Sequence, residues 1–155
     1  MTRCSPPSSS LDIELRVRYV ECDPQNVAHH STYPVWFELA RTELLRAQGA
    51  VYRDLETRGI CFVVARLSVR YKMPARYDDL LQINVQTLPS RGVKVDHAYA
   101  VRRGAALLAT GETTLVCVDR DGVLRPVPEE ILTTGGHDPC LPSPDRGRGM
   151  NAAEK

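Results

Sequence analysis

The chain has one long helix-periodic segment, and most of the sequence after it follows the pattern of β-strands. Between residues 33 and 47 the apolar side chains recur at steps of three and four and form one stripe: Tyr33, Trp36, Phe37, Ala40, Leu44 and Ala47. Pro34 suits the first turn of this helix, Ser31 or Thr32 its cap, and Gly49 its end. A helix with such a stripe must pack it against a sheet.

Strand patterns lie on both sides of this helix in the sequence. Residues 11–20 alternate apolar and polar side chains, and the predicted inward face is Leu11, Ile13, Leu15, Val17 and Tyr19. After a short helix over residues 52–59, four more strands are predicted, over residues 60–72, 80–88, 92–103 and 106–119. Short turns between successive strands predict antiparallel hairpins. The predicted class is α+β, with a curved antiparallel sheet wrapped around one long central helix.

Two residues inside the predicted strands carry expectations of their own. Gly111 indicates either a bulge or a close approach of another group to the backbone. His97 shares the apolar face of its strand with Val95 and Tyr99, so we expect a hydrogen-bonded histidine of the core or of an interface.

Length and composition predict one folded domain in a chain of 155 residues. We expect it to span residues 11–135, between tails over residues 1–10 and 136–155 whose Ser, Pro, Gly and charge content predicts disorder. The net charge of +1 gives no general basis for binding nucleic acid. No apolar run reaches the roughly 18 residues of a membrane span, and no secretory signal begins the chain, so a cytoplasmic protein is predicted. The five cysteines are odd in number and lack metal-ligand spacing, which predicts neither a disulfide framework nor a metal site.

The segment immediately before the long helix contains the densest group of polar residues, CDPQNVAHHS. The start of a helix offers unpaired N–H groups and about half a positive charge, which can stabilise a developing oxyanion. A carboxylate on the preceding loop can attack a carbonyl or activate water. Asp23 and the helix start near His30 therefore predict a hydrolase site.

Two other interpretations of this segment stay open. The same residues can form only a turn and a helix cap. A metal site made by Asp23, His29 and His30 is disfavoured, because adjacent histidines point in different directions and no distant pair completes the set of ligands.

The whole segment resembles a known family. The runs RVRYVECDPQNVAHHSTYPVWFELARTELLR, FVVARLSVRYKMPARYDDLLQI, SRG and LVCVD are similar to the hotdog-fold acyl-CoA thioesterases of the YbgC type, relatives of 4-hydroxybenzoyl-CoA thioesterase. The resemblance implies hydrolysis of an acyl-CoA, or of an acyl carrier protein conjugate, without a cofactor. It also implies a homodimer or homotetramer, assembled from pairs that share a continuous sheet.

The resemblance places individual residues as well. Asp23 matches the catalytic aspartate, as nucleophile or general base, and His30 the residue whose backbone N–H faces the thioester carbonyl. Tyr33 occupies a matching helix position, and Arg91 and Lys94 lie in a turn similar to the one that faces the CoA phosphates.

Three positions depart from the family pattern and point to an altered acyl pocket. Gln25 and Asn26 replace residues that are often glycine, and His29 replaces a residue that is often aromatic. Asparagine tolerates the left-handed conformation, so the turn is expected to survive, with these side chains as substrate contacts. The alternatives on the same fold are a non-catalytic acyl-CoA-binding module and an acyl dehydratase.

Overall fold

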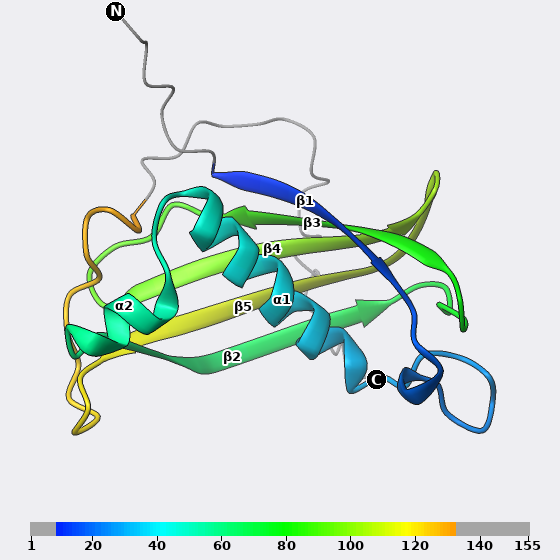
Figure 1. The fold of residues 1–155 in the computed structure, drawn as a ribbon, viewed down its shortest axis with the longest axis horizontal. Helices are drawn as coiled ribbons and strands as arrows, with labels where there is room; N and C mark the ends of the chain where they lie inside the picture. Colours follow the sequence, from blue (N-terminus) through cyan, green and yellow to red (C-terminus); the bar gives the residue numbers. More distant parts are fainter. Residues whose placement is uncertain (1–8, 133–155) are drawn as a thin grey trace, which may run out of the picture.

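The computed structural model describes residues 9–132 of the protein, and its centre is one helix inside a curved sheet (Figure 1). In chain order the elements are β1 (Ser10–Arg16), the 3-10 helix η1 (Tyr19–Glu21), α1 (Thr32–Ala47), α2 (Tyr52–Thr57), β2 (Cys61–Tyr71), β3 (Leu80–Thr87), β4 (Lys94–Arg103) and β5 (Ala106–Val118). The strands form one sheet in the order β1-β3-β4-β5-β2, and every neighbouring pair is antiparallel. The predicted α+β class, with a curved antiparallel sheet around one long helix, is confirmed.

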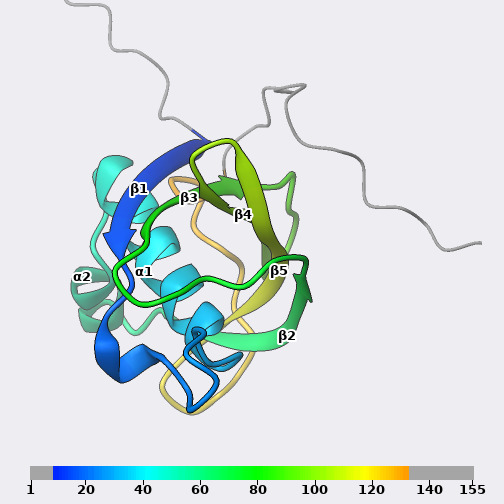
Figure 2. The ribbon, with the colours of Figure 1, turned by 90° about the vertical axis from the view of Figure 1, so that its right-hand side faces the viewer.

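The sheet curves around α1 because each strand places alternate apolar side chains on its inner face (Figure 2). Phe37 of α1 stacks on Tyr99 of β4 with ring centroids 4.3 Å apart. Tyr99 is paired in register with Val85 of β3, and both are buried. The helix stripe and the alternating strands thus form one core.

Gly111 of β5 lies directly against the ring of Phe37 from α1. A Cβ atom at this position would overlap the ring of Phe37 and lie 3.2 Å from the carbonyl oxygen of Ser68. The ladder is regular here, with Gly111 paired to Val69, and the irregularity in β2 falls between Val64 and Arg66. Of the two expectations for Gly111, the close approach is confirmed and the bulge is wrong.

The first strand ends earlier than its pattern predicts. β1 stops at Arg16, and the chain turns into η1, so Tyr19 is 81% exposed instead of facing the core. Val17 still keeps its predicted buried position. The backbone N–H of Val17 donates to the carbonyl of Asp79, after which the chain leaves the sheet.

The long helix begins and ends close to its predicted limits. Pro34 lies in its first turn, and Gly49, at φ +88°, follows its last residues in the left-handed conformation that suits glycine. Ser31 occupies the cap position, but its side chain makes no capping hydrogen bond. Instead the Ser31 hydroxyl pairs with the imidazole of His29.

The two ends of the molecule are distinct (Figure 1). The loop before α1 lies at one end, and α2, with the turn between β3 and β4, lies at the other. The predicted tails fall almost wholly outside the described residues, although Ser10 already belongs to β1.

Candidate active site

The loop that carries Asp23 is closed by its own hydrogen bonds. Cys22 and Ala28 form an antiparallel bridge, and the backbone N–H of Asp23 donates to the carbonyl of Val27 at 2.9 Å. Within this closure, Asn26 N–H returns a bond of 2.9 Å to the carbonyl of Asp23. The loop is therefore a compact turn of fixed shape.

Asn26 adopts the conformation that glycine would take most easily. Its φ is +62°, in the left-handed region, and its side chain is exposed. Asparagine is one of the few residues with a side chain that adopt this region routinely. The expectation that the turn survives without glycine is confirmed.

The carboxylate of Asp23 is half-buried and only partly engaged. Its Oδ1 atom accepts a hydrogen bond of 2.8 Å from the backbone N–H of Gln25, which fixes the side-chain direction. Its Oδ2 atom has no hydrogen-bond partner or counter-ion within residues 9–132. One oxygen is thus held, and the other is free to meet a substrate or a water molecule.

Two backbone hydrogen bonds fasten the end of the loop to the rest of the fold. The backbone N–H of Ala28 donates to the carbonyl of Ala75 at 2.8 Å, and that of His29 donates to the carbonyl of Glu21 at 2.8 Å. These bonds use the N–H groups of Ala28 and His29. The next N–H, that of His30, donates to no other described residue, and α1 begins two residues later.

The buried carboxylate of Glu21 is the main anchor of this region. It accepts hydrogen bonds from the backbone N–H of Arg18 at 2.7 Å, the Arg18 guanidinium at 2.8 Å and the Trp36 indole at 3.1 Å. Burial alone would raise the pKa of Glu21, but these bonds outweigh it and lower that pKa below its ordinary value. An ionised Glu21 therefore joins the turn before the loop to helix α1.

Sequence reasoning missed this role, and the one signal for it was local. When the strand alternation of residues 11–20 is extended to Glu21, it assigns this residue no structural role. The spacing of three between Arg18 and Glu21, which suits a single helical turn, was the available indication.

Tyr71, at the end of β2, was also missed. Its hydroxyl donates to the carbonyl oxygen of His30 at 2.9 Å, and its ring packs edge-on against Tyr33 at 5.0 Å. The carbonyl of His30 is thereby fixed, and with it the orientation of the peptide plane at the helix start.

The predicted substrate contacts fall into two groups. Gln25, Asn26 and His29 are exposed on or beside the loop, and the His29 ring lies 4.1 Å from that of His30. Tyr33, in contrast, is 2% exposed and packs on Trp36 in the core. Burial raises the pKa of the Tyr33 hydroxyl.

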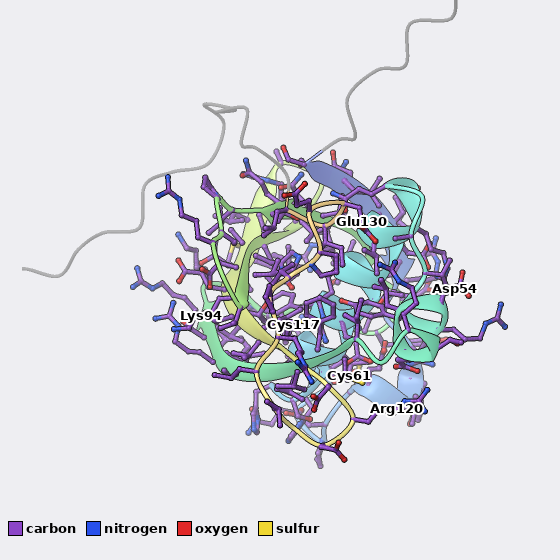
Figure 3. All side chains as sticks on the ribbon, turned by 90° about the vertical axis from the view of Figure 1, so that its left-hand side faces the viewer. Asp54, Cys61, Lys94, Cys117, Arg120 and Glu130 are labelled. Atoms are coloured by element: carbon purple, nitrogen blue, oxygen red, sulfur yellow. The ribbon has the colours of Figure 1, made fainter. Side chains whose placement is uncertain are left out.

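Arg91 and Lys94 lie far from the loop within one chain. Lys94 begins β4 and lies on the outer side of the sheet, at the end that carries α2 (Figure 3). It pairs with Val116, whereas Tyr71, beside His30, pairs with Ala109 seven residues further back along β5. At about 3.3 Å per residue the separation exceeds 20 Å, so a single subunit does not bring these groups together.

Within residues 9–132 no group of three His, Cys, Asp or Glu side chains is arranged to hold a metal ion. No helix in this part of the chain is long and apolar enough to cross a membrane.

Residues 17–134 match the family model described as the thioesterase-like superfamily, and the chain belongs to this family. Its relatives include the acyl-CoA thioester hydrolase YbgC of Escherichia coli, 34% identical over 68% of this chain and 79% of that protein. The acyl-CoA thioesterase YbgC of Haemophilus influenzae is 31% identical over 83% of this chain and 96% of its own length.

A solved structure agrees with the sequence relatives. The DHNA-CoA thioesterase of Staphylococcus aureus superposes with a TM-score of 0.71 at 28% identity, over 76% of this chain and 79% of that one. The predicted enzyme class, a thioester hydrolase, is confirmed. The family therefore favours hydrolysis over the dehydratase and the non-catalytic module.

Proposed function

We propose that the protein hydrolyses acyl-CoA thioesters, with Asp23 as nucleophile or general base and the backbone N–H of His30 as oxyanion donor. The proposal rests on two groups of one compact segment, the Asp23 Oδ2 atom and the His30 N–H. Neither has a hydrogen-bond partner among the described residues. The first can attack the thioester carbonyl or take a proton from water, and the second can donate a hydrogen bond to the carbonyl oxygen as negative charge develops on it.

The positive end of helix α1 adds to this stabilisation. The N–H groups of the first turn are aligned, and their dipoles favour negative charge at the helix start. Tyr71 holds the His30 carbonyl, so the adjoining backbone does not need to reorganise during the reaction. Gln25, Asn26 and His29 remain predicted contacts of the acyl or thiol part of the substrate.

The proposed assembly is a homodimer formed through β2. This strand is at the sheet edge, and residues 63–68 are all exposed, including the apolar Val63, Val64 and Leu67. An exposed apolar edge of this length pairs readily with another strand. Antiparallel pairing of two β2 strands would set the Tyr71 end of one subunit beside the Cys61 end of the other.

Such pairing would also allow basic residues that lie far from the loop of their own subunit to take part in a site. Arg91 and Lys94 of one subunit would come to the side of the partner subunit's Asp23 loop, where the phosphates of CoA need cations. A further pairing of dimers into a tetramer remains a prediction of the family resemblance, and a cytoplasmic location remains a prediction of the sequence.

The decisive experiment compares wild type with Asp23→Asn on a panel of short, long and aromatic acyl-CoAs. Released acid and CoA are separated by chromatography, because the partly exposed thiols of Cys22 and Cys61 would react with a thiol dye. Asparagine can still accept the Gln25 N–H bond, so the loop keeps its shape. We expect a loss of about a hundredfold or more in kcat/KM.

The matched control is Asp54→Asn, an exposed aspartate on α2 (Figure 3). It should hydrolyse the panel at the wild-type rate. Equal rates for Asp23→Asn and wild type would remove Asp23 from the mechanism. The dimer is tested separately with Leu67→Lys, which should sediment as a monomer, against Val123→Lys, an exposed position outside β2.

A further inference from the structure

The backbone at the start of helix α1 is held at three successive peptide groups around His30. The N–H of His29 donates to the carbonyl of Glu21 at 2.8 Å, and the carbonyl of His29 accepts the N–H of Thr32 at 2.9 Å. The carbonyl of His30 accepts the hydroxyl of Tyr71, also at 2.9 Å. The free N–H of His30 belongs to the middle one of these peptide groups, so its direction depends on all three hydrogen bonds.

The hydrogen bond to the His30 carbonyl comes from outside the helix, because the helix has no donor for it. Ser31 already has helical angles, φ −72° and ψ −11°, so the donor that an α-helix would offer to this carbonyl is the N–H of residue 34. Residue 34 is a proline, which has no N–H. No backbone N–H of the described residues donates to the His30 carbonyl. The Tyr71 hydroxyl therefore makes the hydrogen bond that Pro34 leaves unmade.

The sheet holds the Tyr71 side chain in place for this bond. Tyr71 is the last residue of the edge strand β2 and is paired with Ala109 of β5. The backbone N–H of the next residue, Lys72, donates to the carbonyl of Leu108 at 2.8 Å. The Tyr71 ring packs edge-on against Tyr33. Burial raises the pKa of the Tyr71 hydroxyl, so it keeps its proton and remains a donor at neutral pH.

We propose that Tyr71 is a positioning residue for the oxyanion donor, an inference that rests on the proposed thioesterase function. Its hydroxyl replaces the N–H that Pro34 lacks and keeps the helix-start backbone fixed, with the His30 N–H directed at the thioester carbonyl. Charge on that carbonyl oxygen develops in the transition state, so a donor held in place stabilises the transition state more than the bound substrate. Tyr71 acts through the backbone and does not touch the substrate.

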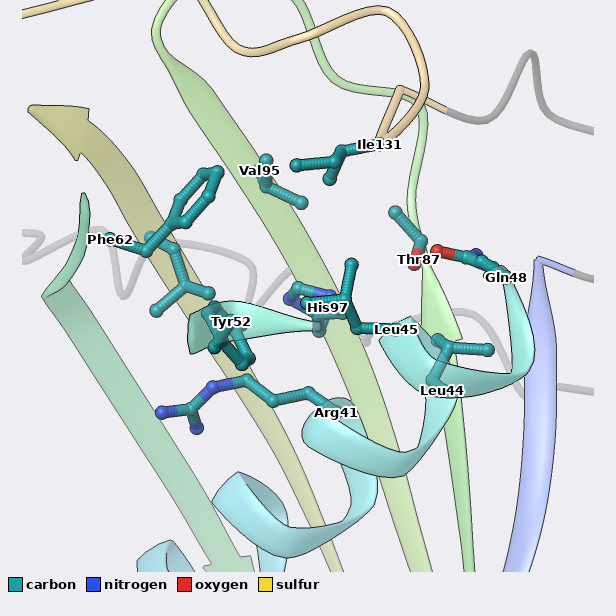
Figure 4. A pocket seen from close by; sticks show the side chains of 11 residues that line it. Arg41, Leu44, Leu45, Gln48, Tyr52, Phe62, Thr87, Val95, His97 and Ile131 are labelled. Carbon is teal, nitrogen blue, oxygen red and sulfur yellow. The ribbon is translucent and has the colours of Figure 1, made fainter. Parts of the chain in front are cut away.

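The other half of helix α1 provides a matched control. There Arg41 and His97 lie beside a small pocket of the core (Figure 4). His97 is buried, as expected of a core histidine, but no described residue supplies the expected hydrogen bond to its Nδ1 atom. The ring of Tyr99 lies 6.2 Å from that of His97, and its hydroxyl pairs with Thr113 at 2.9 Å. This hydrogen bond has the length of the Tyr71 bond but involves no residue of the acid loop.

The first test is steady-state hydrolysis by Tyr71→Phe of the acyl-CoA that wild type hydrolyses fastest. This change removes only the hydroxyl and keeps the ring against Tyr33. We expect kcat to fall by about three- to tenfold, the range that one neutral hydrogen bond covers, with KM unchanged. Tyr99→Phe, which loses a hydroxyl of the same kind, should keep the wild-type kcat. A wild-type kcat in Tyr71→Phe, an equal loss in Tyr99→Phe, or a rise in KM alone would overturn the proposal.

The second test uses the proline. Pro34→Ala restores an N–H at residue 34, which can donate to the His30 carbonyl in place of the Tyr71 hydroxyl. Alone it should leave kcat close to the wild-type value, because the Tyr71 bond is still made. In the Pro34→Ala background, Tyr71→Phe should then lower kcat by less than about twofold. An equal loss in both backgrounds would contradict the assignment, because the hydroxyl would then act on something other than this carbonyl.

Amide hydrogen exchange, measured by NMR, tests the positioning without any substrate. In Tyr71→Phe the N–H of Thr32 should exchange about three- to tenfold faster than in wild type, because the turn it closes on His29 loses the neighbouring bond. The N–H of Ala28, which donates to the carbonyl of Ala75, should keep its wild-type rate. Unchanged exchange at Thr32 would overturn the proposal even if kcat falls. If wild type hydrolyses no thioester of the panel, the proposed function fails, and faster exchange at Thr32 would still show that Tyr71 fixes the helix start.

Discussion

The indole N–H of Trp36 donates a hydrogen bond to the buried carboxylate of Glu21, 3.1 Å away, and joins helix α1 to the turn before the acid loop. Arg18 donates two more bonds to the same carboxylate. The backbone carbonyl of Glu21 also accepts the His29 N–H that precedes the free N–H of His30. One residue thus positions both sides of the candidate site.

Replacing Glu21 should therefore affect both stability and activity. Glu21→Ala leaves the Trp36 N–H buried without an acceptor and should lower the free energy of unfolding by about 1–3 kcal/mol. Urea unfolding measures this change, and hydrolysis should fall because the loop loses its anchor. Glu43→Ala, which removes an exposed ion pair with Arg46 on the same helix, should cost less than about 1 kcal/mol. Similar losses in the two variants would contradict the anchoring role.

The conformation of Asn26 can be separated from its chemistry. Asn26→Ala forces an alanine into the left-handed region and should cost about 1–2 kcal/mol, whereas Asn26→Gly should preserve stability. Asp78, at φ +69°, is the other described non-glycine residue in this region, so Asp78→Ala controls for backbone strain away from the loop. Wild-type hydrolysis by Asn26→Gly would show that the amide is dispensable, and a loss of activity there would assign the amide a contact with the substrate.

The stability of the fold should depend on pH through His97. Burial, reinforced by the charge of Arg41, lowers the pKa of His97 from 6.5 to about 4. The unfolded chain therefore takes up this proton first as the pH falls. The free energy of unfolding is therefore unaffected by this proton above pH 6.5. It falls as the pH is lowered from 6.5 to about 4, by up to about 3 kcal/mol.

Urea unfolding of wild type and His97→Phe between pH 7.5 and 5 measures this effect. As the pH is lowered, the free energy of unfolding of wild type should fall relative to that of His97→Phe. A pH-independent difference would show that His97 does not remain neutral in the fold. Glu21 has the lowered pKa of an anchored carboxylate, so its contribution is lost only at lower pH, as the pH falls from its ordinary pKa of 4.5 through its pKa in the fold.

The contact between Phe37 and Gly111 leaves no room for a side chain. Gly111→Ala should lower the free energy of unfolding by about 1–3 kcal/mol, because the new methyl group overlaps the Phe37 ring. Phe37→Leu provides space beside this position, so the double variant should recover part of the loss relative to Phe37→Leu alone. Strictly additive effects in the double variant would mean that the ring and the glycine are not coupled.

The sequence predicts the elements well because their patterns are local. The helix stripe from Tyr33 to Ala47 and the alternation of each strand depend on neighbours within a few residues, and these limits agree with the structure to within about two residues. The limit of β1 is the exception. Tyr19 fits the alternation, but the chain leaves the sheet at Val17 because the segment at Asp78 and Asp79 pairs with it there.

Within the site, the sequence identifies the groups but not what holds them. Asp23 and the helix start are visible as a loop followed by a periodic segment. The bonds from Trp36 to Glu21 and from Tyr71 to His30 join residues 15 and 41 positions apart, and no local pattern indicates them.

The self-closure of the loop between Cys22 and Ala28 makes it an exchangeable part of the enzyme. Its turn is held by its own backbone, and the bridge leaves the chain entering and leaving at adjacent points. Randomising Pro24, Gln25 and Val27 while keeping Asp23 and a left-handed residue at position 26 should therefore yield mostly folded proteins. Such a library would let substrate preference be evolved without redesigning the sheet.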